Sequence, residues 1–447
     1  MKQIIRICLL ILATTPLIHA QQTDTLKLDI KQTIQLALKN NPNLQRVKLN
    51  EELLERQIKT IESTVYPTVK GKAGYTDNFA LPQQLLPGEI FGQEGQIPVT
   101  FGVRYGVNAG VEVNQLIFSQ DYFANKKMLN SARKTYKLQT LSTMEDLIFN
   151  VAQTYIQYEI TQEQKKILEA NLDRVNKLVE ISQAQYENGI IKKLDVDQLK
   201  VNRTNLLTEL SNLEIGAKQQ LNLLKFYLDI DQSQPISLSE NLEDTNQYTL
   251  DDKLLLEQNL NYQLLQEQLH IAELDKDVIK AAYYPTVSAF AQYNYTGQSD
   301  AFSVSDEHYS GFTAGLWGLN VAIPIFDGFK TKRQLAENQI EIEQLMLDKK
   351  QFVNSAKMQY ENAKVTIAQN ETLANTQEQN MELAQELYDI TNMSYQEGVA
   401  PLTELLNAET SLRESQSQYL TALLNLKLAE LQQFRVSGKL AQVIQSN

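Results

Sequence analysis

The chain has 447 residues, a formal net charge of −13 and one cysteine, Cys8. An acidic chain without a clustered basic stripe is a poor nucleic-acid binder. It also lacks paired histidines at metal-ligand spacing, a phosphate-binding glycine loop and a nucleophile motif, so we expect no enzyme, no cofactor and no metal site.

The first 20 residues are typical of a secretory signal peptide. Lys2 and Arg6 precede a short apolar run, and Ala20 is a small residue that suits cleavage before Gln21. The run is shorter than the ~18 apolar residues that a membrane anchor needs. Cys8 lies inside this segment, so we expect the exported chain to have no disulfide and no lipid-modified cysteine.

The rest of the sequence repeats itself. Three landmarks recur in the same order at similar spacing: Tyr66-Pro67-Thr68-Val69 and Tyr284-Pro285-Thr286-Val287, Ile117-Phe118 and Ile325-Phe326, and Tyr186-x-x-Gly189 and Tyr395-x-x-Gly398. We therefore read the chain as two copies of one unit.

A stretch in the first copy, Val99–Val113, is apolar at every odd position and polar or glycine at every even one. This period of two predicts one long strand, continuing to Phe118, with a different solvent on each face. A lipid-facing wall opposite a wet lumen fits the pattern of a transmembrane β-barrel, and a long edge strand of a soluble sandwich is the alternative. We assign the lipid-facing side to Phe101, Val103, Tyr105 and Val107.

Each copy supplies two such strands and a pair of long helices. The expected strands are 69–75, 99–118, 287–295 and 312–326, joined within each copy by the polar loops 76–98 and 296–311. No glycine or proline occurs in 120–188 or 329–397, which as α-helices would each reach about 100 Å. Each long helix ends at a glycine and returns as a second helix, over 194–227 (interrupted at Gly216) and 402–434.

Four strands cannot close into a barrel, and an open edge in lipid leaves backbone groups unpaired at several kcal/mol each. Three chains supply twelve strands, the smallest closed assembly here with room for an aqueous conduit. The predicted fold class is therefore mainly α with β: a long α-helical barrel plus four transmembrane strands per chain, which form a 12-stranded β-barrel in a trimer.

These elements divide the chain into eight segments. They are the signal peptide (1–20), the N-terminal helices of the first copy (21–66), the first β-hairpin (67–118), the first long helix with its turn and return helix (119–230), the connector and first helices of the second copy (231–284), the second β-hairpin (285–326), the second long helix with its turn and return helix (327–434) and the C-terminal tail (435–447).

Over nearly the whole exported chain, these features resemble the TolC-like outer-membrane efflux proteins. The matching motifs are Ala37-Leu38-Lys39-Asn40-Asn41-Pro42, the two Tyr-Pro strand entries, Pro324-Ile325-Phe326-Asp327-Gly328 and the two Tyr-x-x-Gly turns. The resemblance implies a homotrimeric channel-tunnel in the outer membrane of a Gram-negative cell that extends into the periplasm. It would be the passive exit duct of a tripartite efflux or type I secretion system.

The implied partners are a periplasmic adaptor protein, an inner-membrane transporter and outer-membrane lipid. One alternative is a periplasmic adaptor, which should have a single coiled-coil hairpin flanked by compact β-domains. Another is a coiled-coil filament, which leaves the alternating strands unexplained.

By the same resemblance, the two helix turns form the periplasmic tip. The implied pore gate comprises Glu404, Asn407, Asp195 and Tyr395, and the implied adaptor contacts are Gly189, Ile190, Leu194, Gly398, Val399 and Leu402. Two positions depart from the family pattern, since Asn407 stands where a second ring carboxylate is expected and Ala400 replaces a basic gate residue. Alternatively, Asp195 and Glu404 are first-turn residues favoured by the helix dipole.

Overall fold

The computed structural model describes residues 25–92, 94–239, 254–302, 309–438 and 440. The predicted signal peptide lies outside these residues, as do parts of the connector, of the second loop and of the C-terminal tail. The chain forms two units. The sheet unit comprises Arg46–Leu141 and Leu260–Ser355, and the helical unit comprises Met1–Gln45, Ser142–Asn259 and Ala356–Asn447.

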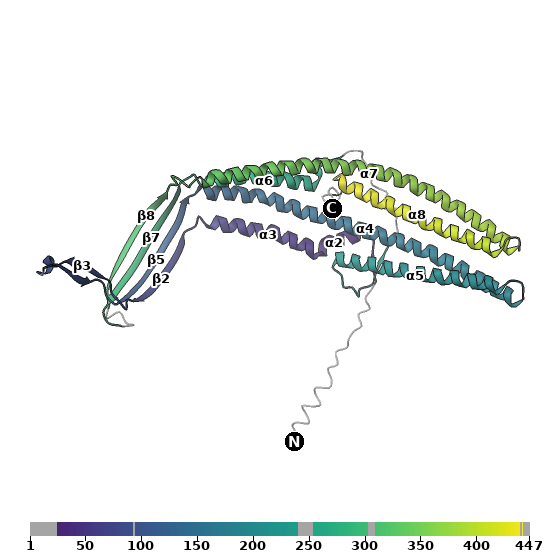
Figure 1. Ribbon diagram of the computed structural model, residues 1–447, viewed down its shortest axis with the longest axis horizontal. Helices are drawn as coiled ribbons and strands as arrows, with labels where there is room; N and C mark the ends of the chain where they lie inside the picture. Colours follow the sequence, from purple (N-terminus) through teal and green to yellow (C-terminus); the bar gives the residue numbers. More distant parts are fainter. Residues whose placement is uncertain (1–24, 93, 240–253, 303–308, 439, 441–447) are drawn as a thin grey trace, which may run out of the picture. The chain divides into compact units, whose positions relative to one another are not determined.

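The main sheet of the sheet unit is antiparallel, and both copies contribute a strand pair to it. Its strands are β2 (Thr68–Asp77), β5 (Tyr105–Phe118), β7 (Thr286–Ser299) and β8 (Ser310–Ala322). They lie side by side in the order β2-β5-β7-β8, so the β5–β7 pairing joins the two copies (Figure 1).

The register of these pairings gives the sheet two chemically different faces. Because side chains alternate along each strand, residues that are paired across the sheet share a face. One face is mainly apolar and includes Val69, Tyr75, Val107, Val111, Val113, Ala291, Tyr293, Trp317, Leu319 and Val321. The other is mainly polar and includes Lys72, Asn108, Glu112, Asn114, Gln292, Asn294, Ser288 and Asn320, with Phe290, Phe312 and Leu316 among them.

The prediction of one continuous strand from Val99 to Phe118 is wrong. The strand is interrupted around Gly102, whose φ of +96° is a left-handed conformation that glycine adopts readily. Before the break, β4 (Gln96–Thr100) pairs with β3 (Gln83–Pro87) in a separate hairpin, with a short 3₁₀ helix, η1 (Gly88–Phe91), between them.

This break corrects two of the residues assigned to the lipid-facing strand. Phe101 and Val103 lie between β4 and β5, outside the four-stranded sheet, whereas Tyr105 and Val107 lie on β5. An alternating pattern runs through a glycine turn without changing its phase, so periodicity alone did not reveal the hairpin. The segment 76–98, predicted as a polar loop, therefore contains strand structure.

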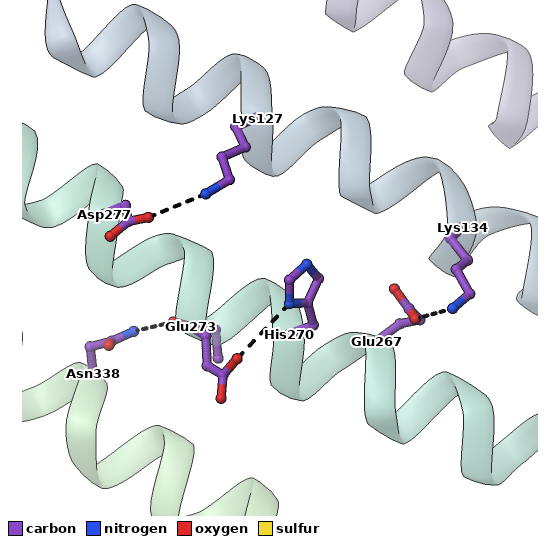
Figure 2. A network of polar contacts seen from close by, with 8 residues as sticks. Lys127, Lys134, Glu267, His270, Glu273, Asp277 and Asn338 are labelled. Carbon is purple, nitrogen blue, oxygen red and sulfur yellow. Dashed lines mark hydrogen bonds and ion pairs between the residues drawn. The ribbon is translucent and has the colours of Figure 1, made fainter. Parts of the chain in front are cut away.

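Ion pairs follow α4 (Gln120–Glu187) where it crosses the sheet unit. Its lysines and arginine meet carboxylates on α3 (Pro42–Ser63) and α6 (Leu260–Ala281). The α3–α4 pairs are Lys126–Glu62 and Arg133–Glu55. Figure 2 shows the α4–α6 pairs, Lys127–Asp277 and Lys134–Glu267. Exposed pairs of this kind contribute little to stability. We therefore expect them to set the alignment of the three helices rather than to stabilise their packing.

The helical unit is built from α2 (Ile30–Asn40), the rest of α4, α5 (Lys193–Leu228), the rest of α7 (Lys330–Gln396) and α8 (Leu402–Val436). The four long helices appear where the sequence predicts them. Gly216, however, does not interrupt α5. A single glycine inside a helix costs about 1 kcal/mol, which is small beside the packing of a helix of 36 residues. Within the described residues, no helix is both apolar enough and long enough to cross a membrane.

Two apolar cores stabilise the helical unit. One lies among α4, α5, α7 and α8 and includes Leu206, Leu405 and Leu412. The other contains a feature that the sequence did not indicate, a parallel pair of short strands, β1 (Leu26–Leu28) and β6 (Ile236–Leu238). A further 3₁₀ helix, η3, spans Leu256–Gln258.

Candidate functional site: the two helix turns

The two turns of the helical unit share one backbone geometry. Gly189 and Gly398 have φ of +74° and +76°, and their N–H groups donate to Tyr186 O at 2.9 Å and to Tyr395 O at 3.0 Å. The next residue of each turn donates to the carbonyl five residues earlier. This is the Schellman arrangement, in which a glycine ends the helix because a Cβ would be strained there. The predicted helix ends are confirmed.

The predicted gate residues differ in their contacts. Asp195 accepts a hydrogen bond from the Lys192 backbone N–H at 3.2 Å and so caps the first turn of α5. Glu404 is exposed in the first turn of α8, and among the described residues its carboxylate has no hydrogen-bond or ion-pair partner. Asn407 is exposed one turn farther along α8 and faces the same side as Glu404.

Tyr395 is half-buried, and its hydroxyl lies 3.4 Å from the hydroxyl of Ser182 on α4. It therefore connects the second hairpin (α7 and α8) with the first (α4 and α5). In the described part of the chain, Tyr395 and Asp195 share no hydrogen bond, although the resemblance places both in a gate-holding network. Ala400 lies in the second turn, where its N–H donates to Ser394 O at 3.1 Å.

The predicted adaptor-contact residues divide into exposed and buried groups. Ile190, Leu194 and Val399 are 70%, 62% and 78% exposed. Leu402, by contrast, is buried with Leu405 in the core among the four helices. Helical spacing places Leu402 and Leu405 on one face, so Leu402 packs within the chain and is removed from the exposed contact set.

A buried polar layer lies next to this core, and sequence reasoning missed it. Glu409 on α8 is 1% exposed, and its Oε2 accepts a hydrogen bond from Asn202 Nδ2 on α5 at 2.9 Å. The guanidinium of Arg174 on α4 lies 5.2 Å from the ring centre of Tyr388 on α7. The available signal was the position of Glu409 between Leu405 and Leu412, on the face that helical spacing assigns to the core.

No group of three or more His, Cys, Asp or Glu side chains among the described residues is arranged to hold a metal ion. His270 Nδ1 lies 3.9 Å from Glu273 Oε2 on an exposed part of α6 (Figure 2).

Comparison with known proteins matches most of the chain. The sequence profile of the family described as outer membrane efflux protein matches residues 33–228 and 253–439. The chain is 24% identical over 421 residues to the probable outer membrane lipoprotein SilC of Salmonella typhimurium, covering 90% of this chain and 84% of SilC. It is 21% identical over 393 residues to the cation efflux system protein CusC of Escherichia coli O157:H7, covering 86% and 80%.

A solved structure supports the same fold. The Campylobacter jejuni CmeC outer membrane channel superposes with a TM-score of 0.74 at 15% sequence identity, covering 93% of this chain and 88% of that one.

Proposed function

The chain belongs to the outer membrane efflux protein family, and on this basis we propose that it is a trimeric channel-tunnel, the passive exit duct of a tripartite efflux or type I secretion system. It is located in the outer membrane and extends into the periplasm. Its partners are a periplasmic adaptor and an inner-membrane transporter, which supplies the energy and selects the cargo.

The observation that carries this proposal is the two-faced sheet with unpaired edges. Within the described residues, β2 pairs only with β5, and β8 pairs only with β7. In lipid these edges leave backbone groups unpaired, a cost that closure with other protomers removes. Pairing β8 of one protomer with β2 of the next is a head-to-tail contact that closes a ring, and three protomers supply twelve strands.

Apolar side chains on two helices of the sheet unit support the same contact. Leu49 and Leu53 are exposed on α3, which precedes β2, and Ile340 and Leu347 are exposed on α7, which follows β8. Pairing of β8 with the neighbouring β2 brings α7 towards the neighbouring α3. The two rows of apolar side chains then cover each other, as coiled-coil seams do.

The proposed gate is a ring of Glu404 and Asn407 side chains around the threefold axis. Three carboxylates close together repel one another and attract cations. The proposed adaptor contact uses Ile190, Leu194 and Val399, which are exposed near the two turns. Tyr395 and Asp195 are proposed to position the turns, Tyr395 through its contact with Ser182 and Asp195 through its helix cap.

The adaptor alternative is not supported. An adaptor should have one coiled-coil hairpin, whereas the described chain has two, each following a β-strand pair. The family match covers both copies.

The first test is the mass of the intact complex after detergent extraction from outer membranes. We expect a heat-sensitive assembly about three times the 50.9 kDa chain, less its signal peptide. Recovery of a water-soluble monomer would contradict the proposal.

A second test addresses Glu404 in single-channel recordings from planar bilayers. We expect Glu404→Ala to reduce the preference for cations over anions, because it removes three carboxylates from the ring. Glu180→Ala, which removes an exposed carboxylate from α4, is the matched control. Unchanged ion selectivity in Glu404→Ala would exclude this residue from the gate.

A further inference from the structure

The polar layer of the helical unit consists of Arg174, Asn202, Tyr388 and Glu409, one residue from each of the four long helices. Asn202 and Arg174 belong to the first hairpin, and Glu409 and Tyr388 belong to the second. The Asn202–Glu409 hydrogen bond and the Arg174–Tyr388 contact therefore both cross from one hairpin to the other. The layer thus contributes polar contacts between the two hairpins.

Two polar atoms of the layer remain unpaired despite their burial. Glu409 Oε1 and Arg174 Nε have no hydrogen-bond partner among the described residues. Glu409 lies on the core face of α8 with Leu405 and Leu412, both 0% exposed. Burial of a charge with incomplete pairing is unfavourable compared with an apolar residue of similar volume.

The first copy has no buried polar side chain at the positions that correspond to Tyr388 and Glu409. By the spacing that relates Tyr186 to Tyr395, Tyr388 corresponds to Val179, which is buried and apolar. Glu409 corresponds to Lys200, which is exposed and whose Nζ donates to Gln183 Oε1 at 3.1 Å. The first hairpin therefore has an apolar residue, Val179, at one of these positions and an exposed charged residue, Lys200, at the other.

We propose that this layer weakens the packing between the two hairpins. Glu409 is then a positioning residue that allows the hairpins to separate when the tip opens. When the hairpins move apart, water reaches Glu409 Oε1 and Arg174 Nε and supplies the hydrogen bonds that they lack in the packed state. The unpaired atoms thus lower the free-energy difference between the packed and the separated arrangements. This inference rests on the proposed function as a channel with a gated tip.

The test replaces the Asn202–Glu409 pair by apolar residues in the full-length trimer. We expect Asn202→Leu/Glu409→Met to raise the thermal unfolding midpoint, because apolar replacement of a buried pair tends to stabilise. We expect the same variant to reduce spontaneous openings in planar bilayers by about tenfold, which corresponds to about 1.4 kcal/mol. Stability and opening should therefore change in opposite directions.

Two further variants complete the experiment. Glu409→Gln keeps an acceptor for Asn202 and should open at a frequency between the wild type and the double variant. Glu414→Met, at an exposed site on α8, should behave as the wild type does. A double variant that opens as often as the wild type, or that loses stability or fails to assemble, would overturn the inference. If the wild-type protein itself formed no channel, the proposed function would fail instead.

Discussion

The sheet of the sheet unit and the long helices of the helical unit use apolar side chains in opposite ways. On the sheet, Trp317 and Leu319 are 81% and 66% exposed, whereas Leu206 and Leu405 in the helices are fully buried. The helical unit therefore completes a core within one chain. Within the described parts of the chain nothing comparable covers the apolar face of the sheet, and in the proposed function that cover is lipid.

The largest effect that tests this comparison is expected on the sheet. Leu319→Arg places a charge on the apolar face, at a cost of roughly 2–4 kcal/mol per protomer near the middle of the bilayer. We expect it to abolish the heat-sensitive trimer in outer-membrane fractions, as measured by semi-native electrophoresis. Asn320→Arg is the matched control, because Asn320 pairs with Ser288 in the next rung of the same ladder and faces the polar side. Equal effects of both variants would show that the faces do not meet different solvents.

Removal of a buried helical side chain is the next largest expected effect. Leu206→Ala should lower the free energy of unfolding by about 2–5 kcal/mol, because it leaves a cavity in a core that the protomer completes by itself. The measurement is the denaturant midpoint of the purified protein. Asn205→Ala, on an exposed face of the same helix, should change it little. A midpoint that Leu206→Ala leaves unchanged would mean that this core forms only between protomers.

A buried acid in the helical unit should make stability depend on pH. Burial raises the pKa of Glu145 to about 7, with Arg435 opposing and Asp146 adding to the rise. The folded chain then holds more protons than the unfolded chain above the unperturbed value of 4.5, so the contribution of Glu145 to stability falls as pH rises towards 7.

The corresponding variant is Glu145→Gln. It should gain stability over the wild type between pH 5 and pH 7 and reach a difference of about 2 kcal/mol, after allowance for solvent screening. The measurement is the unfolding midpoint across this pH range. Glu180→Gln on the exposed face of α4 should give a profile parallel to that of the wild type. A parallel profile for Glu145→Gln as well would contradict the expected titration.

The smallest effect is expected at the helix cap. Asp195→Ala removes the carboxylate that accepts the Lys192 N–H, and should lower the free energy of unfolding by about 1 kcal/mol. Asp197→Ala, at an exposed site two residues farther along α5, should lower it less. If both variants lowered the thermal unfolding midpoint equally, Asp195 would act only through the helix dipole.

Periodicity predicted the long elements well because their signals extend over many residues. The absence of glycine and proline from the two long runs indicated α4 and α7, and the Tyr-x-x-Gly pairs marked the turns. Periodicity failed where one residue decides the outcome. Gly102 lies between β4 and β5 and interrupts the strand in the middle of an unbroken alternation, whereas Gly216 leaves a helix intact.

Within the candidate site, the sequence indicated which residues lie near the turns but not how each is used. Asp195 and Glu404 occupy equivalent positions after their glycines, yet only Asp195 accepts a backbone hydrogen bond among the described residues. Leu402 was predicted to be a contact residue and is buried instead.

The sequence by itself determined the duplicated architecture, the two-faced strands and the positions of the turns, because these follow from local periodicity and backbone preference. Tertiary structure alone decided the β1–β6 pairing, the pairing of β4 with β3, and the buried layer around Glu409. Each of these depends on contacts between residues far apart in the chain, and a local pattern carries no information about which distant side chain supplies a hydrogen bond or excludes water.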